Sequence, residues 1–322
     1  MAEDELDGEG FELSVGPDKT ALSFEAFNTF VTIAALQEEG DVRHAFAKAL
    51  SACRRYESLF SRTIPTSEIS KINNASGSRV EISFDTYDVL RSALRYCSDS
   101  EGLFDITIGP LSKLWNFRNG TVPSDAAIEE ASRFVDWRKL RLGRESAEGA
   151  SSASYWAGLE LSGASVDVGG IAKGWIADRI CALLESEGLS SFVVDLGGNV
   201  AVRGRKADGE PWRVGFRNPQ GEGIVGRVEL SNASAVTSGV YERCFFVDGV
   251  RYHHIVDPKT GRPAQTDLAS ATVLAARSLD AEGFSTPLLA LGERRAEAFV
   301  KRTPEIQAAI LVGNDGSVRV VE

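Results

Sequence analysis

The fold class follows from two adjacent stretches, SVDVGGIAKGWIADRICALLESEG (residues 165–188) and SFVVDLGGNVAVRG (residues 191–204). The first predicts a strand, a Gly-Gly turn and a helix, and the second predicts a strand, a Gly-Gly-Asn turn and another strand. A hairpin thus follows a helix, without the regular strand–helix–strand alternation of a doubly wound sheet. The pattern favours an α+β fold, with mixed or antiparallel sheets and packed helices.

The rest of the chain continues this mixture of helices and hairpins. Residues 27–36 are apolar and β-branched and predict a strand, and the apolar spacing from residue 42 to residue 59 predicts a helix. Asp248-Gly249 is a strong hairpin signal between two apolar runs, and residues 311–322 predict a small hairpin. Further helices are expected over 86–97, 124–134 and 279–300. We expect residues 1–20 to form a loose acidic tail and residues 21–322 to form one domain.

Composition excludes several classes of protein. The chain has 322 residues and a net charge of −11, and it lacks the Lys/Arg-rich block of a nucleic-acid-binding protein. No apolar run is long enough to span a membrane. The acidic N-terminus MAEDELDGEG has no secretory signal pattern, which leads us to expect a cytoplasmic protein. The four cysteines are widely spaced, which indicates reduced thiols rather than disulfides or a zinc site.

The stretch VDVGGIAKG (residues 166–174) has features of an anion site. Its glycines allow a ligand to approach the backbone, and the following helix directs free N–H groups towards the turn. Lys173 adds a charge suited to a phosphate, and Asp167 can accept hydrogen bonds from a base or a sugar. A plain strand-to-helix turn is the alternative, since the stretch matches neither the dinucleotide fingerprint nor a P-loop. DLGGNV (residues 195–200) has the same ambiguity.

Two of the three histidines lie together in YHHIVDPKTGRPA (residues 252–264). Strand alternation places His253 and His254 on opposite faces, so at most one serves a given site. Asp257 begins a sequence typical of a type I turn, in which Gly261 takes the left-handed position. Asp257 is therefore either a functional carboxylate or only a turn residue.

Two further stretches carry small polar groups. In TSG (residues 237–239) the small side chains allow a flat ligand to lie against the backbone. In LDAEGFSTPLLALG (residues 279–292) Glu282 and Thr286 are four residues apart and share one helical face. A carboxylate and a hydroxyl are oxygen ligands suited to Mg²⁺. The alternative is a solvated Glu282 and a Thr286 that faces the core.

The order of these motifs resembles the FAD:protein FMN transferase family, the ApbE-type flavin transferases. The resemblance runs from about residue 22 to the end and rests on six stretches: ESLFSRTIPTSEISKIN (57–73), GLFDITIGPLSKLWNF (102–117), VDVGGIAKGW (166–175), VTSGVYERCF (236–245), HIVDPKTGRP (254–263) and EGFSTPLLALG (282–292).

The resemblance implies Mg²⁺-dependent transfer of FMN from the substrate FAD to a Thr or Ser hydroxyl of an acceptor flavoprotein, with release of AMP. Two alternatives stay open. The same site would serve an FAD pyrophosphatase, which gives FMN and AMP, or a non-catalytic FAD-binding protein.

The resemblance also implies roles for individual residues. It matches His254, supported by Asp257, to catalysis and leaves His253 structural. It matches the metal ligands to the Gly170 carbonyl, Glu282 and Thr286; the family usually has Asp in place of Glu282, and Asp280 is the alternative carboxylate. FAD contacts are expected from Phe27, Thr63, Phe104, Asp105, Asp167, Lys173, Thr237, Ser238, Gly239, His254 and Ile255.

Overall fold

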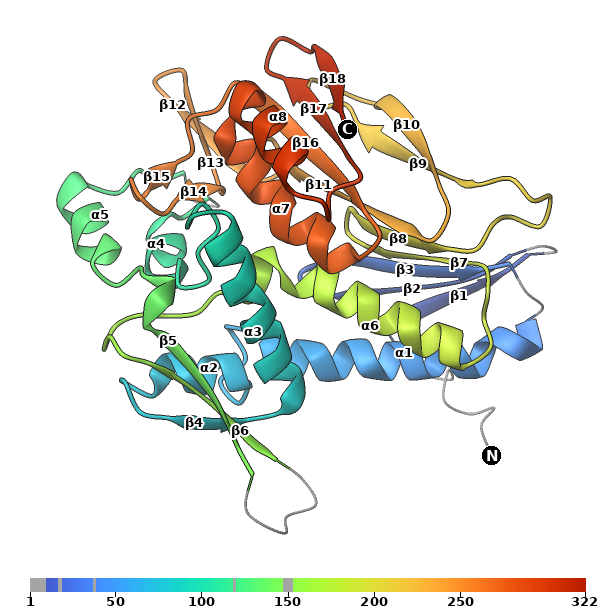
Figure 1. Cartoon of the computed structure of the whole chain (residues 1–322), viewed down its shortest axis with the longest axis horizontal. Helices are drawn as coiled ribbons and strands as arrows, with labels where there is room; N and C mark the ends of the chain where they lie inside the picture. Colours follow the sequence, from blue (N-terminus) through green and yellow to red (C-terminus); the bar gives the residue numbers. More distant parts are fainter. Residues whose placement is uncertain (1–9, 17–18, 37–38, 118–119, 147–152) are drawn as a thin grey trace.

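A nine-stranded antiparallel sheet runs through the molecule (Figure 1), with the strand order β1-β2-β3-β7-β8-β11-β16-β17-β18. The computed structural model describes residues 10–16, 19–36, 39–117, 120–146 and 153–322, without the side chains of residues 39–41. The strands are β1 (Phe11–Val15), β2 (Thr20–Ala26), β3 (Thr29–Ala35), β7 (Phe192–Leu196), β8 (Asn199–Arg203), β11 (Ala233–Gly239), β16 (Leu268–Ala275), β17 (Ala308–Gly313) and β18 (Val318–Val321).

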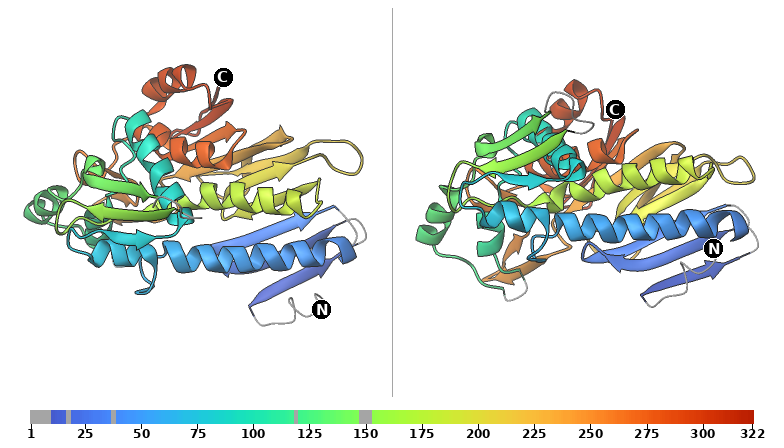
Figure 2. Two further views of the ribbon diagram at one scale, coloured as in Figure 1. Left: turned by 60° about the horizontal axis from the view of Figure 1, so that its bottom comes forward. Right: turned by 90° about the horizontal axis from the view of Figure 1, so that it is seen from below.

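The two faces of this sheet are covered differently. Helices α1 (Glu39–Phe60), α6 (Ala172–Ser186) and α7 (Ser278–Leu291) form the layer on one face, and the hairpin β9 (Trp212–Arg217) and β10 (Ile224–Leu230) packs on the other (Figures 1 and 2). Successive side chains of β16 show the alternation, since Val273 belongs to the helical core and Leu274 to the core under the hairpin. Because α7 is buried almost all round, each of its polar side chains needs a partner.

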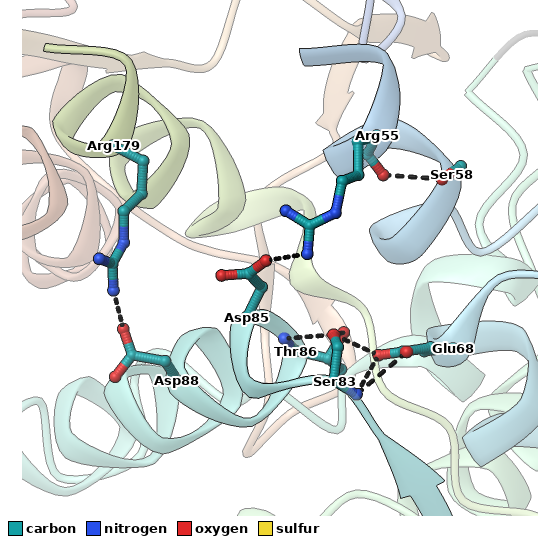
Figure 3. Close-up of polar contacts among 8 residues, drawn as sticks. All are labelled: Arg55, Ser58, Glu68, Ser83, Asp85, Thr86, Asp88 and Arg179. Atoms are coloured by element: carbon teal, nitrogen blue, oxygen red, sulfur yellow. Dashed lines mark hydrogen bonds and ion pairs between the residues drawn. The ribbon is translucent and has the colours of Figure 1, made fainter. Parts of the chain in front are cut away.

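A small three-stranded sheet, β4-β6-β5, lies at one end of the helical layer. It consists of β4 (Val80–Ile82), β5 (Leu140–Glu145) and β6 (Ser154–Leu159), and it packs with α2 (Glu68–Asn74) and α3 (Phe84–Asp99). Figure 3 shows how α3 begins. The Ser83 hydroxyl accepts a hydrogen bond from the Thr86 N–H at 3.3 Å, and the Glu68 carboxylate accepts bonds from the Ser83 N–H and hydroxyl.

A third, smaller core surrounds Trp115. Its elements are α4 (Gly109–Leu114), α5 (Asp125–Ser132), the hairpin β12 (Cys244–Val247) and β13 (Val250–His253), and the short pair β14 (Val256–Asp257) and β15 (Arg262–Pro263). The Trp115 ring stacks on Phe117 and Tyr252, and its Nε1 donates a hydrogen bond to the Gly261 carbonyl at 2.8 Å. These contacts tie the histidine stretch to the body of the protein.

The α+β prediction is confirmed, and so are the three predicted hairpins, which are β7–β8, β12–β13 and β17–β18. Asp248 and Gly249 have φ values of 49° and 79°, as a two-residue hairpin turn requires. The predicted helix over 279–300 is two helices, α7 and α8 (Glu293–Arg302), because Gly292 at φ 74° breaks the helical path. No helix in the described part of the chain is long and apolar enough to cross a membrane.

Two local predictions are wrong. The expected loose tail includes β1, which pairs with β2 from Phe11↔Phe24 to Val15↔Thr20, while residues 1–9 lie outside the described part. The strand expected before Gly169 is reduced to a single bridge, Ile108↔Ser165, followed by the 3₁₀ turn η2 (Val168–Gly170). A second 3₁₀ turn, η1 (Trp137–Lys139), precedes β5.

Candidate functional site

A partly buried ion pair joins the start of α6 to the middle of α7. Lys173 Nζ donates a hydrogen bond to Glu282 Oε1 at 2.6 Å, while Oε2 accepts bonds from the Gly174 N–H and, at 3.4 Å, from Asn199 Nδ2. Glu282 is only 4% exposed, so its charge depends on these donors. The alternative of a solvated Glu282 is therefore excluded.

The close approach of α6 and α7 makes this pairing possible. A Cβ on Gly174 would lie 2.6 Å from the Ser278 carbonyl oxygen and 2.9 Å from Leu279 Cα, so only glycine fits there. Asp178 of α6 also caps α7, because its carboxylate accepts the Ser278 and Leu279 N–H groups at 2.8 and 3.1 Å. Both contacts fix where Glu282 lies relative to the first turn of α6.

A row of hydroxyls lies where the end of β11 meets α7. Ser238 Oγ is 2.8 Å from Ser285 Oγ and 3.1 Å from Thr286 Oγ1, and Thr237 Oγ1 is 2.8 Å from Thr272 Oγ1. A Cβ on the next residue, Gly239, would lie 2.5 Å from the Tyr241 ring. Thr286 thus bonds to Ser238, one of the residues expected to contact FAD.

The two histidines occupy different environments. His253 is buried, and its Nε2 lies 3.1 Å from the Ala264 carbonyl oxygen. His254 follows the strand, its backbone N–H donates to the Arg243 carbonyl at 3.0 Å, and its buried Nδ1 has no hydrogen-bond partner within the described residues. Burial, with the positive charge of Arg243 and the proximity of His253, lowers the pKa of His254 to about 4. His254 is therefore neutral at pH 7.

The turn after the histidines is held by Asp257. Its side chain accepts the Lys259 N–H at 2.9 Å, and its carbonyl accepts the Gly261 N–H at 2.9 Å. Gly261 has a φ of +67°, and a Cβ there would lie 2.5 Å from Ile128 Cγ2. Ile255 is buried behind this turn, and its carbonyl accepts the Ala264 N–H at 2.9 Å. Asp257 thus acts as a turn residue in these contacts.

Asp167 anchors the other side of the Gly-Gly turn. Its Oδ2 accepts hydrogen bonds from Arg62 at 2.8 Å and from Ser112 at 3.1 Å, and its Oδ1 accepts the Gly169 N–H at 3.0 Å. Phe104 lies against Gly170, since a Cβ on that glycine would be 3.1 Å from the phenyl ring. The Asp167 carboxylate is therefore already held by an arginine before any ligand binds.

Three of the residues expected to contact FAD make their hydrogen bonds mainly within their own loops or to a neighbouring helix. Asp105 is buried, which raises the pKa of its carboxyl, and it accepts bonds from Thr107 and from the Trp137 N–H. Thr63 Oγ1 lies 3.0 Å from Ser61 Oγ. Phe27 has a φ of 58°, and its N–H donates to Glu57 at 2.7 Å.

The expected magnesium ligands fit the ion chemically. Glu282, Thr286 and the Gly170 carbonyl are all oxygen donors, as Mg²⁺ prefers, and the turn that contains Gly170 packs against α7. A cation, the Lys173 ammonium, already lies 2.6 Å from the Glu282 carboxylate. The Asp280 carboxylate binds other residues, since it accepts a hydrogen bond from the Tyr96 hydroxyl at 2.6 Å and pairs with Arg95. Glu282, rather than Asp280, is the carboxylate beside Lys173.

Sequence reasoning missed three residues that the site uses. Asn199 bonds to Glu282, Arg62 bonds to Asp167, and Ser285 bonds to Ser238. Only Asn199 carried a signal, since it follows the Gly-Gly turn in DLGGNV. Its role depends on β8 reaching α7, a contact between distant segments that no local pattern reveals.

Comparisons with known proteins show the family to which the chain belongs. The model of the ApbE family matches residues 27–310. The FAD:protein FMN transferase of Treponema pallidum is 36% identical over 84% of this chain and 78% of its own length, and that of Klebsiella pneumoniae (strain 342) is 31% identical over 83% and 82%. The structure superposes on the ApbE protein of Thermotoga maritima with a TM-score of 0.82 and 29% identity, covering 97% of each chain. It superposes on the flavin transferase ApbE of Vibrio cholerae with a TM-score of 0.80 and 28% identity, covering 96% of this chain and 97% of that one. The chain belongs to the ApbE family.

Proposed function

We propose that this protein transfers the FMN part of FAD to a Ser or Thr hydroxyl of an acceptor protein and releases AMP, with Mg²⁺ as cofactor. The observation that carries the proposal is the meeting of two groups on helix α7 in a chain of this family. These are the Lys173–Glu282 pair and the hydroxyls of Ser238 and Thr286. The third group that the proposal uses is His254, which is neutral at pH 7.

The reaction is a substitution at phosphorus. The acceptor hydroxyl oxygen forms a bond to the FMN phosphorus, the bond from that phosphorus to the AMP oxygen breaks, and AMP leaves with the electron pair. Such reactions depend mainly on positioning and on neutralising charge. Lys173 and the N–H groups at the start of α6 are suited to hold the pyrophosphate.

His254 is suited to take the proton from the acceptor hydroxyl. A base must be unprotonated at the working pH, and the pKa of about 4 meets that condition. When bound, Mg²⁺ held by Glu282, Thr286 and the Gly170 carbonyl would supply positive charge against the phosphate oxygens.

The test is an incubation of the purified protein with FAD, with and without Mg²⁺. It includes a candidate acceptor domain with an exposed Thr, and the Thr→Ala variant of that domain as the matched control. AMP release and the intact mass of the acceptor are followed. We expect a metal-dependent mass gain of one FMN phosphoester on the Thr form alone. AMP release without any mass gain would indicate a pyrophosphatase instead of a transferase. FAD binding without AMP release would indicate a non-catalytic FAD-binding protein.

A further inference from the structure

A second charged pocket is lined by residues other than those expected to bind FAD or the metal. It has a volume of 450 Å³ and is lined mainly by Phe84, Asp88, Arg91, Arg95, Arg179 and Arg277. Three elements build it, because the lining residues come from α3, from α6 and from the residue that precedes α7. None of them belongs to the predicted FAD or metal site. In a chain with a net charge of −11, four arginines around one pocket are an exception that requires a reason.

The buried Asp88 holds part of this cluster in place (Figure 3). It accepts hydrogen bonds from Arg91 at 2.7 Å and from the Trp175 indole at 2.9 Å. It also accepts one from Arg179 at 2.8 Å, which is the bond that Figure 3 shows. Burial by itself raises the pKa of Asp88, but these hydrogen bonds outweigh it and keep the pKa below its ordinary value. The single carboxylate therefore stays ionised and is shared by two guanidinium groups.

The arginines keep donor capacity for a ligand. A guanidinium has five N–H donors, and within the described residues Arg91 and Arg179 each show one hydrogen bond, both to Asp88. In the part of the chain that the structure describes, Arg277 shows only the long ion pairs to Asp178 at 3.7 Å and to Asp280 at 4.0 Å. More of the donors of Arg95 are occupied, because it pairs with Asp99, Asp280 and Glu305. Arg91, Arg179 and Arg277 are thus the groups available to an anion.

We propose that this pocket binds a small molecule through a phosphate group, with the free N–H groups of Arg91, Arg179 and Arg277 as the donors. Forked guanidinium groups match phosphate geometry. The volume of the pocket is that of an ordinary small-molecule site. Phe84 is 47% exposed, so its ring offers an apolar surface for the rest of the ligand.

Titration calorimetry with inorganic pyrophosphate and with ADP, at low salt and without Mg²⁺, tests this proposal. The variant is the double substitution Arg91→Gln/Arg277→Gln, at side chains that are 64% and 55% exposed. Arg133→Gln, at a side chain that is also 64% exposed but outside the pocket, is the matched control. We expect wild type and control to bind both probes, and the double variant to bind about 10-fold more weakly or worse.

Each outcome decides. If both probes bind with equal affinity, the phosphate group alone is sufficient for binding. If ADP binds more tightly and this gain is lost in Phe84→Ala, the pocket also recognises the base. Failure of wild type to bind either probe, or equal binding by the double variant, overturns the proposal. Repeating the titration with saturating FAD separates this pocket from the candidate active site, since competition by FAD would assign the anion to the active site instead. The comparison of arginine variants does not depend on the proposed transferase activity.

Discussion

The chemistry expected of the candidate site depends on a few buried groups whose charges compensate one another. Glu282 is the clearest case, because its carboxylate is taken out of water and paired with Lys173, Gly174 and Asn199. A substitution that removes the charge of Glu282 but keeps the shape of its side chain therefore separates its electrostatic role from its packing role. The Glu282 side chain reaches the first turn of α6 from the middle of α7.

We predict that Glu282→Gln lowers Mg²⁺-dependent AMP release by about 100-fold or more, as expected for loss of one charge-positioning group. The substitution also leaves Lys173 without its anion, which we expect to lower the free energy of unfolding by roughly 1–3 kcal/mol. An AMP-release assay and urea unfolding measure the two effects, and calorimetry measures Mg²⁺ binding. Glu282→Asp is the control, and it should keep most of the metal affinity. Unchanged turnover in Glu282→Gln would remove this residue from the site.

The two histidines should respond differently to substitution. We expect His254→Ala to abolish turnover with little change in stability. His253→Ala should instead lower stability by about 2–3 kcal/mol, through the lost packing and the lost bond to the Ala264 carbonyl, while keeping turnover per folded molecule. Circular dichroism and AMP release at matched folded concentration give the comparison. Equal losses of turnover would show that the assignment of the two histidines is wrong.

The lowered pKa of His254 also predicts a pH dependence. Its pKa is about 4 in the folded chain against an ordinary value of 6.5, so between these values the unfolded state binds more protons. The stability that neutral His254 contributes is complete above pH 6.5 and is lost as pH falls to 4, by roughly 3 kcal/mol in all. Comparing the urea midpoints of wild type and His254→Gln across this range measures it. Parallel curves would contradict the lowered pKa.

At the scale of elements, the contact between α6 and α7 decides whether the site forms. Asp178 supplies the N-terminal cap of α7, and Gly174 lets the two helices touch near Glu282. Burial raises the pKa of Asp178, which shows the cost of placing a carboxyl between the helices, and the N–H groups of Ser278 and Leu279 oppose that shift. The helix junction, rather than either helix, is therefore the unit that positions Lys173 and Glu282.

We predict that Gly174→Ala separates these helices. Its Cβ would meet backbone atoms at 2.6 and 2.9 Å, so α7 must shift, and we expect a stability loss of about 1–3 kcal/mol. Mg²⁺ affinity should fall as well, because Glu282 moves with α7. Gly226→Ala is the control, since a Cβ there would be 3.8 Å from Phe216. Melting temperature and calorimetry give both readouts, and a Gly174→Ala protein like wild type would contradict this packing.

For the whole molecule, the nine-stranded sheet gives a scaffold in which one face carries the candidate site and the other carries the β9–β10 hairpin. Strand β1 is the edge of this sheet, and its Phe11 and Leu13 pack against the main core. An edge strand protects the next strand from pairing with other chains. We therefore expect β1 to contribute to stability and solubility rather than to chemistry.

Deleting residues 1–18 should lower the melting temperature by several degrees and promote aggregation, while FAD turnover per folded molecule stays unchanged. Deleting residues 1–9 is the matched control, because the difference between the two truncations reports the segment that contains β1. Differential scanning fluorimetry and light scattering measure the outcome. If both truncations melt alike, β1 makes no net contribution.

Local sequence determined much of this protein. Turn chemistry predicted the Asp248-Gly249 hairpin and the Asp257–Gly261 turn, and apolar periodicity predicted most of the helices, because both depend on residues close in the chain. The order of the motifs indicated the family. The sequence also singled out Lys173 and Glu282, but separately, with no indication that they pair.

The tertiary structure alone decided which groups meet. Lys173 and Glu282 are 109 residues apart, and their bond exists because α6 and α7 touch through Gly174. The same holds for Asn199, for the burial that lowers the pKa of His254, and for the pairing that turned an expected tail into β1. Local patterns report which face of an element is apolar. They do not report which distant partner covers it, and that partner sets burial, charge and reactivity.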